Sequence, residues 1–270
     1  MLLDANLSIL FTELPLLERP RAAKRAGFDA VEFWWPFDTA TPRPAEVDAF
    51  VAALDAAGTR LVGLNFFAGD MPAGDRGIVS WPGRQGEFAD SVEIAVDIAR
   101  RTGCRTFNAL YGNRIAGFTP SEQDELATAN LVVAATSVRA IDGTIVLEPL
   151  SGAPDYPLLT AADALAVADR VPLDNVTLLC DLYHLAVNRD DLDTVTSKHI
   201  ERIGHVQFAD APGRGEPGSG RLDLLRHLTT LAANGYRGHV GAEYRPTGAT
   251  ADSLGWLPGL GQEILRRELS

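Results

Sequence analysis

The chain has few cysteines and few basic residues for its length, and each shortage excludes a class of protein. Only Cys104 and Cys180 occur in 270 residues, and both lie in apolar, strand-like stretches. This is far below the density of a secreted disulfide scaffold, so we expect two reduced thiols. The 24 Lys and Arg residues are outnumbered by 36 Asp and Glu residues, which gives a net charge of −12. Such a chain repels phosphate backbones, and we expect it to bind no nucleic acid.

Long apolar runs are also lacking. None approaches the roughly 20 residues of a membrane-spanning helix, and Asp4 stands where a signal peptide would carry positive charge. We therefore expect no membrane association and a cytoplasmic location. A hydrophobic content of 46% with 22% charged residues is ordinary for a folded protein and excludes a wholly disordered chain.

Apolar runs of strand length alternate with longer stretches of helical periodicity. This order favours βα units and a parallel sheet, and eight units in 270 residues predict a single (β/α)8 TIM barrel domain spanning residues 1–270. The expected strands are Leu7–Phe11, Ala30–Phe33, Arg60–Leu64, Thr106–Leu110, Ile145–Glu148, Val176–Cys180, Gly204–Phe208 and His239–Glu243.

The segments between the strands predict an outer ring of helices. Ser121 with Asp124 three residues later resembles a capping box. The expected helices are Leu14–Ala26, Glu46–Ala56, Ala89–Arg101, Ser121–Ala140, Thr160–Val171, Asp190–His199, Leu222–Ala233 and Leu260–Leu269. Three long segments rich in Gly and Pro follow strands, where barrel enzymes place their binding loops: Phe66–Gly86, Ser151–Leu159 and Asp210–Arg221.

Four expected strands end on a side chain that offers an oxygen to a cation: Glu148, Asp181, Gln207 and Glu243. Each alone has an ordinary explanation, such as a helix cap or a salt-bridge partner. Together they would converge on one mouth of the barrel. Oxygen donors suit Mg²⁺ or Mn²⁺, and a bound cation would relieve the repulsion among three carboxylates.

Short motifs surround these residues and occur elsewhere in the chain. They are Asn6-Leu7-Ser8, Phe11-Thr12-Glu13, Ala26–Phe33, Pro82-Gly83-Arg84, Val146–Ser151, Cys180–His184, His205–Gln207 and Ala242–Pro246. As a set they resemble hydroxypyruvate isomerases and the similar 2-oxo-tetronate isomerases, and the resemblance runs from Asn6 to about Trp256.

The resemblance implies a barrel of the xylose isomerase-like superfamily that holds one divalent metal ion. Glu148, Asp181, Gln207 and Glu243 would bind the metal, Mg²⁺ or Mn²⁺ with Co²⁺ or Zn²⁺ as further candidates, and Glu148 and Glu243 would be the catalytic acid/base pair. Gln207 stands where the related ketose 3-epimerases have a histidine, which favours the hydroxypyruvate isomerase branch. Endonuclease IV shares the barrel, but the five histidines here are not spaced to bind its three zinc ions.

The implied reaction interconverts hydroxypyruvate and tartronate semialdehyde, or a similar small 2-oxo acid, through an enediolate. His184 would lie just past a strand end, where its ring could bond a substrate hydroxyl. Arg84 and Arg214, in loops over the barrel mouth, would bind the substrate carboxylate, and Glu216 would orient Arg214. Each arginine could equally be a solvated loop residue.

Aromatic residues follow the second and third strands. Trp34 and Phe66 would wall the substrate off from water, although packing alone would also explain them. Glu32 either partners a site residue or faces the barrel interior, and we assign it no catalytic role. His199, His205, His227 and His239 are interpreted as structural.

Two other functions remain open. One is a sugar or inosose isomerase, or a ketose 3-epimerase, of the same superfamily, which would take an uncharged ketose. The other is a barrel that only binds a sugar acid. The competent groups at all four ligand positions speak against a binding protein, and the chain could also form a homo-oligomer.

Overall fold

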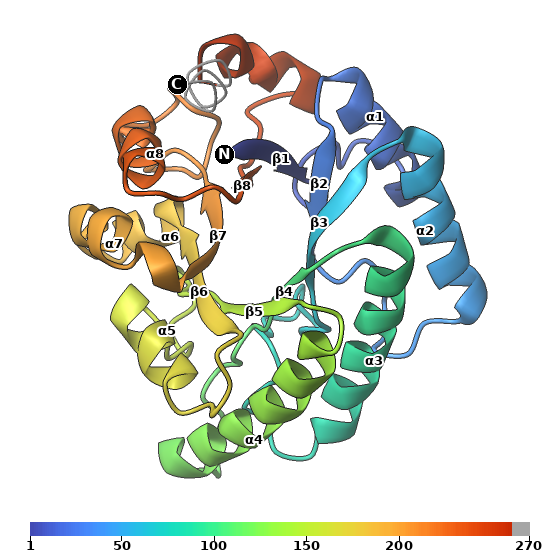
Figure 1. Ribbon diagram of the computed structural model, residues 1–270, viewed down its shortest axis with the longest axis vertical. Coiled ribbons are helices and arrows are strands. Elements are labelled where there is room, and N and C mark those ends of the chain that lie inside the picture. The colour runs from blue at the N-terminus through green and yellow to red at the C-terminus, as the bar shows by residue number, and fades with distance from the viewer. Residues whose placement is uncertain (261–270) are drawn as a thin grey trace.

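The computed structural model describes residues 1–260. Eight parallel strands form a closed barrel in which each strand pairs with the next and β8 pairs with β1 (Figure 1). The strands are β1 (Leu2–Asn6), β2 (Ala30–Phe33), β3 (Arg60–Asn65), β4 (Thr106–Asn108), β5 (Thr144–Leu147), β6 (Val176–Asp181), β7 (Ile203–Phe208) and β8 (His239–Ala242). The predicted (β/α)8 barrel is confirmed.

Helices cover the outside of the barrel (Figure 1). Their buried residues are mainly apolar; in α3 these include Phe88, Val92, Ala95 and Ile98, so the core lies between the helices and the strands. The helices are α1 (Arg19–Arg25), α2 (Pro44–Ala57), α3 (Gln85–Thr102), α4 (Pro120–Arg139), α5 (Ala161–Ala168), α6 (Leu182–Val187), α7 (Leu192–Lys198) and α8 (Leu224–Ala233), with 3-10 turns at Leu16–Glu18, Ile200–Arg202 and Thr250–Trp256.

The predicted first strand is wrong. The sequence predicts it at Leu7–Phe11, whereas β1 is Leu2–Asn6 and pairs with β8 from Leu2 opposite His239. Residues 7–11 form a turn beyond the strand, with Phe11 in a left-handed conformation at φ 56°. Leu7, Leu10 and Phe11 are buried there, and Ile9 is partly buried. The true strand is hard to recognise because the polar residues Asp4 and Asn6 interrupt its apolar pattern. Both are buried in the structure.

The predicted start of α4 also needs correction. Thr119, not Ser121, caps the helix. Its side chain accepts from the backbone N–H of Glu122, and the Glu122 carboxylate accepts from the backbone N–H of Thr119. The capping box therefore begins two residues earlier than expected. The short helix α6 was not predicted, and the predicted helix Leu260–Leu269 lies outside the described residues except for its first residue.

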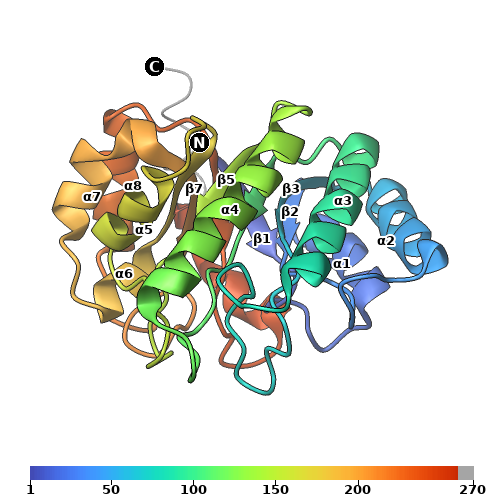
Figure 2. The same ribbon diagram turned by 90° about the horizontal axis from the view of Figure 1, so that it is seen from below.

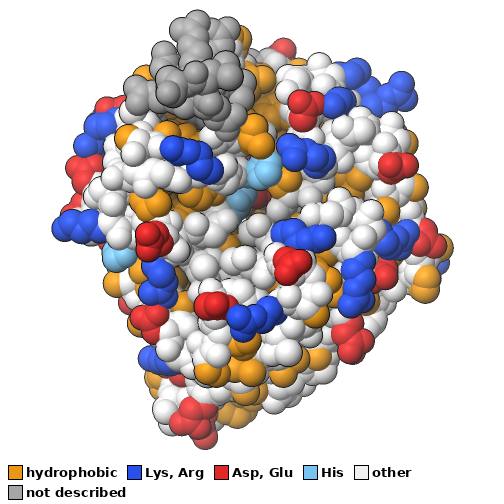
Figure 3. Space-filling model, viewed as in Figure 1, with side chains coloured by type: hydrophobic (Ala, Val, Ile, Leu, Met, Phe, Trp, Pro, Cys, Tyr) orange, Lys and Arg blue, Asp and Glu red, His pale blue; other side chains and the backbone are white. Residues whose placement is uncertain are grey.

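The three long loops lie at the C-terminal ends of the strands, along the lower edge of Figure 2. They join β3 to α3, β5 to α5 and β7 to α8, as the sequence predicts. The opposite end of the barrel, seen in Figure 3, carries acidic and basic side chains interspersed with one another. Within residues 1–260, no helix is both long enough and apolar enough to cross a membrane.

Candidate active site

The four predicted metal ligands lie at the C-terminal ends of four consecutive strands. Glu148 directly follows β5, Asp181 ends β6, Gln207 is the penultimate residue of β7, and Glu243 directly follows β8. Asp181 and Gln207 are paired in register, and the Glu243 N–H donates to the Phe208 carbonyl. All four are at most 5% exposed. The barrel thus places the four oxygen donors at the same end of four neighbouring strands.

Two buried oxygens in this group have no hydrogen-bond partner among residues 1–260. Asp181 Oδ1 accepts from the backbone N–H groups of Tyr183 and His184 at the start of α6, but Oδ2 accepts none. Gln207 Oε1 is likewise unpartnered. A buried unpaired oxygen costs roughly 1–3 kcal/mol. Of the four, Glu148 and Asp181 place ligand atoms within 4.8 Å of one another and of a His184 nitrogen. The carboxylate and amide oxygens of the set match the chemistry of a hard divalent cation.

Burial and mutual repulsion disfavour ionisation of the two glutamates. Burial, then the charges of Glu243 and Asp181, raise the pKa of Glu148 well above its ordinary value. Burial also raises the pKa of Glu243 to about 7, although the Arg214 guanidinium acts in the opposite direction. Burial therefore favours the protonated form of both glutamates, and the Glu243 carboxyl can take up and release a proton near neutral pH.

Polar side chains that the sequence analysis missed hold these glutamates. Asn108 Nδ2 donates to Glu148 Oε2 over 2.6 Å, and Asn6 Nδ2 donates to Glu243 Oε1 over 3.0 Å. Trp34 Nε1, from the predicted set, donates to the same Glu243 oxygen over 2.5 Å. Asn6 and Asn108 end β1 and β4. Like the proposed metal ligands, both are polar residues at a strand end. The sequence did not indicate them because the predicted first and fourth strands extend too far toward the C-terminus.

The hydrogen bonds of His184 fix its tautomer. The backbone N–H of Ser151 donates to Nδ1 over 2.9 Å, so Nδ1 is an acceptor and the proton of the neutral ring is on Nε2. Burial lowers the pKa of His184 to about 4, against the raising effect of Asp181, so the ring is neutral. Nε2 lies 3.9 Å from Glu148 Oε1 and 3.8 Å from Asp181 Oδ2. It therefore offers one N–H to the site.

A cavity of about 530 Å³ opens above the glutamates. Glu148, Glu243, Trp34 and His184 line it, together with three arginines, Arg76, Arg214 and Arg245. Arg214 donates to Glu243 Oε2 over 2.7 Å, and its Cζ lies 5.6 Å from the centre of the Tyr183 ring. The cavity is thus acidic at its base and has cationic groups on its walls.

Three predicted substrate-binding residues do not line this cavity. Arg84 is held outside it by Glu87, with bonds of 2.8 and 2.6 Å, and by Asp75. Phe66 is buried in a stack with Phe107, their ring centres 5.5 Å apart. Glu216 accepts from Thr247 instead of orienting Arg214, which is held by Glu243. Loop sequence alone does not determine which way such side chains point.

Curated relatives match over almost the whole chain. A protein named putative hydroxypyruvate isomerase from Streptomyces coelicolor is 50% identical, covering 94% of this chain and 95% of the relative. Hydroxypyruvate isomerase of Escherichia coli K12 is 33% identical, covering 94% and 97%. A 2-oxo-tetronate isomerase from Haemophilus influenzae is 34% identical, covering 94% and 96%.

Solved structures and a family model agree with these matches. A Brucella melitensis protein named AP endonuclease, family 2, superposes with a TM-score of 0.86 at 35% identity, covering 96% of this chain and 98% of its own. A 3-keto-D-glucoside 4-epimerase from E. coli superposes with a TM-score of 0.77 at 23% identity, covering 96% and 99%, which shows a shared fold. The family model described as xylose isomerase-like TIM barrel matches residues 20–260. The chain therefore belongs to the xylose isomerase-like TIM barrel family, within its group of hydroxypyruvate and 2-oxo-tetronate isomerases.

Proposed function

We propose that this isomerase interconverts hydroxypyruvate and tartronate semialdehyde, or a similar small 2-oxo acid, at one divalent cation. The observation that carries the proposal is the pair of buried glutamates with raised pKa values, Glu148 and Glu243, both lining one cavity beside the unpartnered oxygens of Asp181 and Gln207. The names of the relatives support the same reaction.

The four strand-end residues are the proposed holders of the cation. Glu148, Asp181, Gln207 and Glu243 would contribute carboxylate and amide oxygens, for which Mg²⁺ or Mn²⁺ is the best chemical match. When bound, the cation would act as a Lewis acid on the adjacent carbonyl and hydroxyl oxygens of the substrate.

The chain itself supplies the proton transfers. The substrate must lose a proton from the carbon that bears the hydroxyl and gain one at the neighbouring carbon, while a proton moves between the two oxygens. Glu148 and Glu243 line the same cavity, so one can accept the first proton and the other can deliver the second. His184 Nε2–H would donate to the substrate oxygen on which negative charge develops.

The cationic walls of the cavity favour a substrate with a carboxylate. Arg214 is only 14% exposed and lies beside Glu243, and Arg76 and Arg245 line the same cavity. A guanidinium binds a carboxylate through two parallel, charge-assisted hydrogen bonds. An uncharged ketose, the substrate of the alternative epimerase function, would leave these cations unused.

Proton NMR in D2O tests the reaction directly. Pure protein with Mg²⁺ or Mn²⁺ is expected to convert hydroxypyruvate and to exchange its C3 protons for deuterium. Glu148→Gln and Glu243→Gln should each lower turnover by about 10²-fold or more, because each removes a proton-transfer group. Glu216→Gln is the matched control and should leave turnover unchanged, because Glu216 lies outside the cavity.

Failure of both conversion and exchange in the wild type would contradict the proposal, as would normal turnover in both active-site variants. Faster turnover of an uncharged ketose would instead favour the epimerase function. An abasic DNA duplex serves as a counter-screen because of the name of the Brucella melitensis protein. We expect no cleavage, because the net charge of −12 repels DNA.

A further inference from the structure

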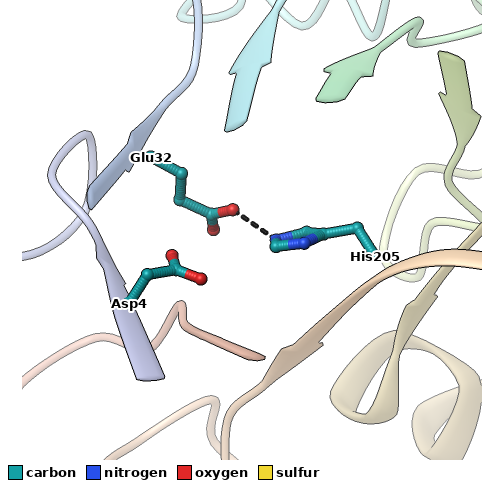
Figure 4. A group of neighbouring side chains, drawn as sticks. All are labelled: Asp4, Glu32 and His205. Atoms are coloured by element: carbon teal, nitrogen blue, oxygen red, sulfur yellow. Dashed lines mark hydrogen bonds and ion pairs between the residues drawn. The ribbon is translucent and has the colours of Figure 1, made fainter. Parts of the chain in front are cut away.

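A buried group of titratable side chains lies within the barrel, next to the proposed metal ligands. Glu32 of β2 and Asp4 of β1 point toward one another and toward His205 of β7 (Figure 4). The three residues are 2%, 0% and 3% exposed, respectively. Barrel interiors are usually filled by branched apolar side chains. Charges buried in their place are costly, so a packing role alone does not account for them.

The neighbouring strands leave space for the Glu32 carboxylate. A Cβ atom at Gly241 of β8 would lie 2.6 Å from Glu32 Oε1, and one at Gly63 of β3 would lie 3.0 Å from Oε2. Two glycines on different strands therefore make room for one acidic side chain. Any larger residue at Gly241 would displace the carboxylate.

Glu32 determines how the Gln207 amide is oriented. Gln207 Nε2 donates to Glu32 Oε1 over 2.7 Å. A carboxylate oxygen only accepts, so the amide NH2 must face Glu32, and Gln207 Oε1 must be the atom left over. That oxygen is one of the two buried, unpartnered atoms of the site. Without Glu32, nothing in these contacts would prevent the amide from presenting its NH2 group to a cation.

Glu32 is also linked to a second proposed ligand. Asn6 Nδ2 lies 3.1 Å from Glu32 Oε1 and 3.0 Å from Glu243 Oε1, so one amide group bridges the two carboxylates. His205 Nε2 lies 2.6 Å from Glu32 Oε2 and compensates its charge. Both Glu32 oxygens therefore have partners within the barrel interior.

We propose that Glu32 is a positioning residue for the metal site: it directs Gln207 Oε1 toward the cation and, through Asn6, holds the Glu243 carboxylate. This inference rests on the proposed function only for the identity of the four ligands. It assigns Glu32 no contact with substrate and no proton transfer.

Mn²⁺ binding tests the inference without reference to turnover. Electron paramagnetic resonance measures the concentration of free Mn²⁺ during a titration of metal-stripped protein. Glu32→Gln is expected to weaken Mn²⁺ binding by about 10- to 100-fold, the usual effect of losing a partner that orients a ligand. Asp4→Asn is the matched control. Asp4 lies in the same buried group, but its oxygens form no hydrogen bond with any proposed metal-ligating residue. The Mn²⁺ affinity of this variant should therefore equal that of the wild type.

A reciprocal exchange separates orientation from general damage. Gln207→Glu alone opposes two carboxylates at a contact of 2.7 Å, so it should also weaken Mn²⁺ binding. The double variant Glu32→Gln/Gln207→Glu pairs an amide with a carboxylate again, with the donor now on β2, and should bind Mn²⁺ more tightly than either single variant. Such non-additivity is the sign of a direct coupling.

Two results would overturn the role of Glu32: wild-type Mn²⁺ affinity in folded Glu32→Gln, or losses that simply add in the double variant. A second bound Mn²⁺ that disappears in Asp4→Asn would assign the buried group to a cation instead. Circular dichroism checks folding. If Glu32→Gln does not fold, Glu32→Asp replaces it: this variant keeps the charge but withdraws the carboxylate, and it should weaken Mn²⁺ binding to the same degree. A wild type that binds Mn²⁺ without isomerising hydroxypyruvate would contradict the proposed function alone; a wild type that binds no Mn²⁺ would overturn both.

Discussion

Arg214 donates a hydrogen bond to Glu243 over 2.7 Å, and this pair joins the cationic wall of the cavity to its acidic base. Against the effect of its burial, the negative charges of Glu243, Asp181 and Glu148 raise the pKa of the guanidinium. A carboxylate bound by this guanidinium would therefore lie beside the proposed metal ligands. The Arg214 backbone has φ 59°, a conformation that non-glycine residues rarely adopt and that often marks functional sites.

Replacing this guanidinium should weaken recognition of a carboxylated substrate. We expect Arg214→Met to lower kcat/KM for hydroxypyruvate by about 10- to 100-fold, because a hydrogen bond to a charged group contributes about 1.5–3 kcal/mol. Steady-state kinetics measure the change. Arg84→Ala is the control and should leave kcat/KM unchanged, since Arg84 is paired with Glu87 and Asp75 outside the cavity. Equal losses in the two variants would contradict this role for Arg214.

The sequence predicts the barrel and the positions of the four strand-end residues, for a physical reason. A strand in a closed parallel barrel is buried on both faces, so its body is apolar and its end is marked by the first polar group. Glu148 and Glu243 stand directly after such runs. Glu32 was harder to interpret because it is a polar residue within a strand, where only the three-dimensional pairing shows what it contacts.

The loops account for most of the errors. Arg76 and Arg84 lie in the same segment between β3 and α3, yet only Arg76 lines the cavity. Their directions depend on local contacts, such as the bond from Arg76 Nη1 to the Met71 carbonyl and the pairing of Arg84 with Glu87. No periodic pattern constrains such side chains. Arg245 was within reach of the sequence analysis, because it lies two residues after Glu243 in a motif already singled out.

His184 should contribute as a neutral hydrogen-bond donor. We expect His184→Ala to lower kcat by about 10²-fold, a typical loss when a donor to a developing negative charge is removed. Because the pKa of His184 is about 4, the pH profile of the remaining activity above about pH 5 should keep its shape. Kinetics over this pH range make the measurement, with circular dichroism as the check of folding.

Ser151→Ala provides the matched comparison for His184. The variant loses the hydroxyl that lies 2.7 Å from Nδ1 but keeps the backbone N–H that bonds the same nitrogen. The tautomer should therefore be preserved, and kcat should fall much less than in His184→Ala. A loss as large as that of His184→Ala would mean that the hydroxyl, and not the backbone N–H, fixes the ring.

The raised pKa of Glu243 predicts how metal binding depends on pH. In the metal-free protein this carboxyl titrates at about 7, against an ordinary value of 4.5. Between these values the folded state holds a proton that the unfolded chain has lost, so the contribution of Glu243 to the free energy of unfolding falls as pH rises. A cation requires the deprotonated form, so Mn²⁺ affinity should increase over the same range and binding should release protons.

Thermal unfolding with and without Mn²⁺ measures this linkage. The increase in Tm caused by Mn²⁺ should grow from about pH 5 to about pH 7.5. His184 contributes in the opposite direction in the metal-free protein, because its lowered pKa makes the folded state gain stability as pH rises from about 4 to 6.5. The His184 contribution is the same in Glu243→Gln, so comparing the wild type with this variant isolates the contribution of Glu243. If the Mn²⁺-induced increase in Tm showed the same pH dependence in wild type and variant, Glu243 would not be the group whose proton the cation displaces.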